Sequence, residues 1–253
     1  MISRRKMNVS LIGTAAVLAG RTVRAEAQAE AELDSVFTQL TYPSFDALNA
    51  PERFGLEIPN KAQREKAAEI IKDAPRGPTP YDIARSFVDK YYEKNPELIS
   101  QWPLPAAWNP LIVEFFNATT LKVNNDMVHW CAAFANWCIS RAGRISSNSA
   151  GSQSFLSTKV FKKVDAPKVG DLAIFTCYDQ KSGKSLGLGH ATFVREVPSN
   201  GKVKVTGGNQ SKDGHSSIIC DSEFPVGDRI VKRQLNGNYI ATVMRLNSYI
   251  AII

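Results

Sequence analysis

The chain has 253 residues, of which 43% are hydrophobic and 22% charged, an ordinary composition for a globular protein. This length allows one large domain, or one medium domain with an appendage. The net charge of +7 is concentrated in residues 1–27, which hold five basic residues and one acidic residue. Subtracting these from 31 basic and 24 acidic residues leaves 26 and 23, an excess of only +3. This argues against a nucleic-acid-binding protein.

Residues 1–27 are typical of an export signal. A basic start is followed by an apolar stretch over residues 9–20, which is too short to span a bilayer as an ordinary helix. Ala25 and Ala27 fit an A-x-A cleavage site, which would leave Gln28 as the first residue. We therefore expect a periplasmic or secreted protein with no membrane span once the signal is removed. The alternative is an amphipathic N-terminal helix.

The letters SRRKM, residues 3–7, resemble a twin-arginine export signal. Met7 and Asn8 stand where such signals usually carry a bulky apolar pair, so the export route stays open.

Residues 28–100 are expected to form a helical N-terminal region. Asn60 is a candidate cap for a helix that stops before Pro75. Thr79 is a candidate cap for the next helix, in which Pro80 suits the first helical position.

The stretch VHWCAAFANWCISRAGR, residues 128–144, predicts a helix with Cys131 in its first turn or two. Its apolar residues fall on one helical face, and Gly143 is a natural terminator. Asp126 is the candidate N-cap. Asn109 and Pro110 repeat the cap-plus-proline signal of a shorter helix before it.

After residue 150 the pattern changes to strands. Apolar runs separated by Gly, Asn, Asp and Ser have connections too short to hold a helix. The sheet should therefore be antiparallel, and helices followed by strands indicate an α+β fold.

Four cysteines occur, Cys131, Cys138, Cys177 and Cys220, without a C-x-x-C motif. The absence of this motif argues against a zinc ribbon and against a thioredoxin-like redox site. Cys177 and Cys220 lie in strand-like segments and could pair in an oxidising compartment, or stay free and buried.

A helix N-terminus and a neighbouring imidazole both stabilise a thiolate, and Cys131 has the first of these by position. Of the three histidines, His190 is the best candidate base, because GLG delivers it to the start of an apolar strand. His129 is close to Cys131 in sequence, and His215 lies in a polar turn.

Asn209 is the candidate third residue, which would accept a hydrogen bond from the ring of His190. It continues the face of Val203 and Val205 by strand parity, whereas Gln210 has the wrong parity. The glycines at 207 and 208 would allow a close approach of a neighbouring element. Each residue also has an ordinary structural interpretation, and it is the set that points to catalysis.

The segments WCAAFANWC, PKVGDLAIF, GHATFV and GGNQ, in this order, resemble the CHAP family of cysteine, histidine-dependent amidohydrolases/peptidases, related to NlpC-type hydrolases. The resemblance covers residues 100–246. It implies a papain-like fold, a cysteine hydrolase domain over residues 101–253, and cleavage of an amide bond in bacterial peptidoglycan. It further implies Cys131 as nucleophile, His190 as base and Asn209 as third residue.

We expect no cofactor and no metal, and a monomer whose partner is peptidoglycan. The backbone N–H of Cys131 and the side chain of Asn125 are candidate donors to the oxyanion. Two alternatives stay open. One is a non-catalytic cell-wall-binding module on the same fold. The other is a metal site formed by His129, Cys131 and His190, for which no fourth ligand is evident.

Overall fold

The computed structural model describes residues 58–101, 107–126, 128–211, 217–235 and 238–252, and for residues 232–235 and 238–239 it describes only the backbone. The export signal, residues 28–57 and His215 lie outside the described residues. The main elements, in chain order, are α3 (Lys61–Asp73), α4 (Pro80–Phe87), η2 (Val88–Tyr92), η3 (Pro96–Ile99), α5 (Pro110–Phe115), η4 (Phe116–Ala118), α6 (Cys131–Arg141), η5 (Ser152–Leu156), β1 (Lys162–Val164), β2 (Leu172–Asp179), β3 (Ser185–Ser199), β4 (Lys202–Gln210), β5 (Ile218–Pro225), β6 (Arg229–Leu235) and β7 (Asn238–Ala251).

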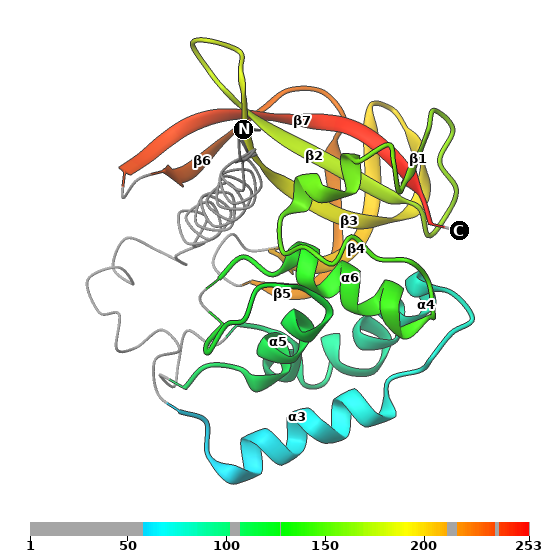
Figure 1. Ribbon diagram of the computed structural model, residues 1–253, viewed down its shortest axis with the longest axis vertical. Helices are drawn as coiled ribbons and strands as arrows, with labels where there is room; N and C mark the ends of the chain where they lie inside the picture. The colour runs from blue at the N-terminus through cyan, green and yellow to red at the C-terminus, as the bar shows by residue number, and fades with distance from the viewer. Residues whose placement is uncertain (1–57, 102–106, 127, 212–216, 236–237, 253) are drawn as a thin grey trace, which may run out of the picture.

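The strands form one antiparallel sheet in the order β1-β7-β2-β3-β4-β5. Strand β6 pairs with the first half of β7, residues 238–244. The helices precede the strands along the chain and gather on one side of the sheet, with α6 next to it and α3 farthest away (Figure 1). The expected α+β class with an antiparallel sheet is therefore confirmed. The finer expectation of a papain-like arrangement stays a prediction.

Side-chain caps start the helices at the places that the sequence predicts. Asn60 forms a capping box with Gln63 at the start of α3, and Thr79 forms one with Asp82 at the start of α4. Asn109 accepts a hydrogen bond from the N–H of Leu111 at the start of α5. Each cap satisfies backbone N–H groups that the first turn leaves without an intrahelical partner.

Helix α6 begins at Cys131, as the sequence predicts, and ends before Gly143, whose φ of +70° suits a glycine. The predicted cap is wrong. Trp130 occupies the N-cap position, and no side chain caps the helix. Asp126 is buried and accepts a hydrogen bond from the N–H of Asn109. A cap has to precede the first helical residue directly, and Asp126 lies too far upstream to do so.

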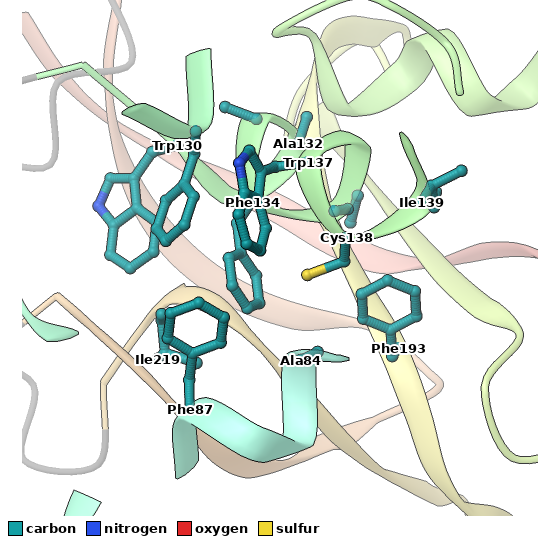
Figure 2. Close-up of a cluster of buried hydrophobic side chains, with 14 of the residues drawn as sticks. Ala84, Phe87, Trp130, Ala132, Phe134, Trp137, Cys138, Ile139, Phe193 and Ile219 are labelled. Carbon is teal, nitrogen blue, oxygen red and sulfur yellow. The ribbon is translucent and has the colours of Figure 1, made fainter. Parts of the chain in front are cut away.

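An aromatic cluster joins α4 and α5 to α6. The ring of Phe87 in α4 makes edge-to-face contacts with Phe115, Phe134 and Trp137, at centroid distances of 5.7 to 5.9 Å. Figure 2 shows the rings of Phe87, Phe134 and Trp137 together, with Phe193 of β3 beside Cys138 of α6. This cluster fills one side of the sheet, so α4 contributes to the same core as α6.

A second, smaller core lies against the other face of the sheet. It contains Phe175, Cys177, Val194 and Val205, among other buried residues. Cys220 belongs to the first core and Cys177 to the second, and neither is in a disulfide. The disulfide that the sequence left open is therefore not formed, because the two cysteines sit on strands that are not neighbours and in different cores.

Among the helices that the structure describes, none combines the length and the apolar character that crossing a membrane requires.

The position of Phe87 predicts that Phe87→Ala lowers the free energy of unfolding by about 3–5 kcal/mol, because it removes a fully buried ring and leaves a cavity among three aromatic neighbours. Urea denaturation measures this change. Val197→Ala is the control, since Val197 is 63% exposed and should lose no more than about 0.5 kcal/mol. Equal losses in the two variants would contradict the packing of α4 described above.

Candidate active site

Cys131 is the first residue of α6, and its side chain is only 4% exposed. Because no side chain caps this helix, the N–H groups of its first turn face the start of the helix together with the positive end of its dipole. Both features stabilise a negative charge, such as a thiolate or an oxyanion, at this position. The sequence-based placement of Cys131 is therefore confirmed.

Cys138 lies two turns further along the same helix and has a different environment. It is fully buried, and this burial raises the pKa of its thiol well above the usual value. A neutral buried thiol is a poor nucleophile. Cys138 therefore serves as packing, and it offers a matched control for experiments on Cys131.

Strand β4 holds the start of α6 through a glycine. A side chain at Gly208 would overlap the indole ring of Trp130 and approach the Cβ atom of Phe134. These two residues flank Cys131 in sequence. At Gly207, a side chain would overlap Thr192 of β3. The expected close approach at both glycines is confirmed, and it fixes the position of the α6 N-terminus relative to the sheet.

His190 lies in β3, and its side chain is 6% exposed. It pairs across the sheet with Phe175, and its ring meets the ring of Phe224 edge-on at 5.7 Å between centroids. Both phenylalanines belong to the second core, so His190 lies on the sheet face that carries this core. Its neighbours Ala191 and Phe193 point to the other face, toward the helices.

The side chain of Gln210 is hydrogen-bonded to His190. The Nε2 atom of His190 lies 3.2 Å from Oε1 of Gln210, which also accepts from the hydroxyl of Thr192 at 3.1 Å. The amide nitrogen of Gln210 donates to the backbone oxygen of Cys220 at 2.5 Å. The assignment of Asn209 as the third residue stays a prediction, and the amide oxygen of Gln210 holds the position at the His190 ring that was expected for Asn209.

The reason is a bulge in β4. Asn209 has a φ of +57°, and the pairing with β5 shifts register between Gly207 and Gln210. One residue in the left-handed conformation breaks the alternation of side chains, so residues beyond it change faces. The parity argument that favoured Asn209 over Gln210 is wrong at this point.

Asn209 points toward the start of α6. Its amide nitrogen lies 2.8 Å from Nδ1 of His129, two residues before Cys131, and its oxygen accepts from the hydroxyl of Ser217 at 2.7 Å. The same hydroxyl accepts from the indole N–H of Trp130 at 3.1 Å. Asn209 thus belongs to a polar network at the α6 N-terminus.

Residues 208–210 therefore connect the two predicted catalytic residues. Gly208 packs against the flanks of Cys131, Asn209 contacts His129, and Gln210 holds His190. Two adjacent amides point to two different histidines. The contacts to His190 and to the residues beside Cys131 therefore come from the same end of β4.

The other sequence-based candidates have different outcomes. The side-chain amide of Asn125 donates to the side chain of Asn124. The role of Asn125 as an oxyanion donor stays a prediction. Within the described part of the chain, no three His, Cys, Asp or Glu side chains gather as they would around a metal ion.

Sequence reasoning missed Gln210 and the network of His129 because it assumed a regular strand through residues 203–210. One signal could have found them. Asn is enriched in the left-handed conformation, and Gly-Gly-Asn at the end of a strand is typical of a bulge or turn.

Residues 123–209 match the family model of the CHAP domain. The match includes Cys131, His190 and Asn209, and it ends one residue before Gln210. No curated protein and no solved structure matches the chain.

The contact at Gly208 predicts that Gly208→Ala lowers the free energy of unfolding by about 1–3 kcal/mol, because the added methyl group overpacks the indole of Trp130. Urea denaturation and the near-UV signal of the tryptophans measure the change. Gly227→Ala is the matched control, since a side chain there meets open space and should cost less than about 0.5 kcal/mol. A fully tolerated Gly208→Ala would mean that β4 does not hold the start of α6 this closely.

Proposed function

We propose that this chain is an exported cysteine hydrolase. Residues 123–209 match the CHAP domain, and this domain points to hydrolases that act on peptidoglycan as amidases or peptidases. The chain cleaves an amide bond in peptidoglycan through an acyl-enzyme. The observation that carries this proposal is the position of Cys131, at the uncapped start of a buried helix that β4 holds in place.

Cys131 is the nucleophile in this proposal. Its reactive form is the thiolate, which the start of α6 favours through the N–H groups of its first turn and the positive end of the helix dipole. Cys138 has neither feature, because it lies inside the helix and its burial disfavours the thiolate.

His190 is the general base and later the general acid. It takes the proton of the Cys131 thiol, and the thiolate attacks the amide carbonyl. The tetrahedral intermediate collapses to a thioester as the imidazolium gives its proton to the leaving amine. A water molecule that loses its proton to His190 then attacks the thioester, which releases the carboxylic acid and restores the thiol.

The tetrahedral intermediate places a negative charge on the former carbonyl oxygen. The backbone N–H of Cys131, at the start of the uncapped helix, is one donor for this oxyanion. The side chain of Asn125 is a second candidate, five residues before the Trp130 N-cap. Asn209 supports the site indirectly, since its network with His129 and Ser217 braces the segment that leads into Cys131.

The export of the protein follows from residues 1–27, which lie outside the described residues. We expect the chain in the periplasmic or secreted fraction to start at Gln28, because Ala25 and Ala27 fit the cleavage site. N-terminal sequencing of the protein recovered from that fraction, and from the cytoplasm as a control, measures this. An intact N-terminus in every fraction would contradict the proposed signal.

The enzymatic proposal predicts that Cys131→Ala abolishes the release of soluble fragments from purified cell wall, because the proposed thioester forms on the sulfur of Cys131. Cys138→Ala is the matched control in the same helix, and it should keep most of the activity with at most a loss of stability. Mass spectrometry of the fragments measures the release, and the fragment masses identify the amide bond that is cut.

Two results would contradict the proposal. Activity that survives in Cys131→Ala would remove Cys131 from the reaction. Wild-type protein that sediments with cell wall but releases no fragments would instead support the non-catalytic binding module.

A further inference from the structure

We propose that Gln210 is the positioning residue of His190 and fixes the imidazole in the tautomer that carries its proton on Nε2. This leaves Nδ1 as the basic nitrogen. The role of Nδ1 as base toward Cys131 rests on the proposed function, whereas the tautomer itself does not.

The orientation of the Gln210 amide is set by its surroundings. Its NH₂ group donates to the backbone oxygen of Cys220, and a carbonyl oxygen can only accept. The Oε1 atom must therefore face the opposite way, where it accepts from the hydroxyl of Thr192 and lies 3.2 Å from Nε2 of His190. A flipped amide would place two oxygens against each other at Cys220.

The fixed amide determines the protonation of the ring. An oxygen at hydrogen-bond distance from Nε2 requires a proton on this nitrogen, since two acceptors would otherwise face each other in a buried site. In neutral imidazole the other nitrogen then carries the lone pair. Gln210 can keep the same bond when His190 becomes charged, because imidazolium also carries a proton on Nε2. Gln210 can therefore bind both the neutral and the charged form of the His190 imidazole.

The rest of the His190 environment is consistent with an oriented ring. The edge contact with Phe224 limits rotation of the imidazole. The guanidinium of Arg229 lies over the same Phe224 ring, at 4.3 Å from its centroid.

Asn209 serves a different histidine. Its amide nitrogen lies beside Nδ1 of His129, and its oxygen is occupied by the hydroxyl of Ser217. The two neighbouring amides, at 209 and 210, therefore provide a matched pair. A carboxylate at one position should act on His129, and a carboxylate at the other should act on His190.

The tautomer is tested directly by long-range ¹H–¹⁵N NMR of the full chain labelled with ¹⁵N. The chain has three histidines, so His129→Gln and His215→Gln assign the signals of His190 by elimination. At a pH above the titration of His190, we expect the proton on Nε2 and the unprotonated signal on Nδ1. A proton on Nδ1 of His190 would overturn the proposal.

The matched substitutions test the partner. Gln210→Glu should raise the pKa of His190 by about 1–3 units, because a carboxylate at Nε2 stabilises the imidazolium. Asn209→Asp should raise the pKa of His129 and leave that of His190 close to its wild-type value. The same NMR titration measures both histidines. A His190 pKa that responds to Asn209→Asp and not to Gln210→Glu would overturn the assignment.

A third variant, Gln210→Met, keeps the approximate volume and removes the hydrogen bond. It should lose its preference for the Nε2–H tautomer and, if the chain is a hydrolase, should reduce kcat by about 10-fold or more with little change in KM. The tautomer and pKa results stand without any activity. If the proposed function is wrong, turnover will be absent while the Nε2–H tautomer is intact. If the present proposal is wrong, His190 will carry its proton on Nδ1, or its pKa will not change in Gln210→Glu.

Discussion

The close contact between Gly208 and the residues on either side of Cys131 is the constraint on which the rest of the site depends. Without a side chain at 208, the backbone of β4 can lie against Trp130 and Phe134 and hold the first turn of α6. The next two residues of the same strand then reach His129 and His190. Three consecutive residues of β4 therefore set the position of the helix, of the polar network before it and of the candidate base.

This contact is effective because α6 cannot easily move. Nearly all of its residues are buried, and its aromatic side chains meet Phe87 of α4 and Phe115 of α5. Dense packing of this kind transmits a shift at one end of a helix to the other end. Helix α4 lies outside the residues that match the CHAP domain, yet it supports the helix that carries Cys131. The part of the chain before the match thus has a structural role.

Much of this arrangement could be predicted from local signals. The caps at Asn60, Thr79 and Asn109, the stop at Gly143 and the start of α6 at Cys131 each depend on a few neighbouring residues. The antiparallel sheet followed from short connections.

The remainder depends on contacts between distant segments, which sequence patterns do not encode. The bulge at Asn209 reverses the faces of the residues after it, so simple alternation chose the wrong partner for His190. Asp126 is held by Asn109, and this long-range bond removed it from the predicted cap.

The most direct test of the central claim is the rate at which Cys131 reacts with iodoacetamide from pH 4 to pH 9, compared between the wild-type chain and His190→Ala. Peptide mass spectrometry separates Cys131 from the other cysteines. An activated thiolate predicts rapid reaction of Cys131 well below the ordinary thiol pKa of about 8.5, and a shift of the profile toward that value in His190→Ala. A wild-type profile centred near the ordinary value, and unchanged in His190→Ala, would contradict the account.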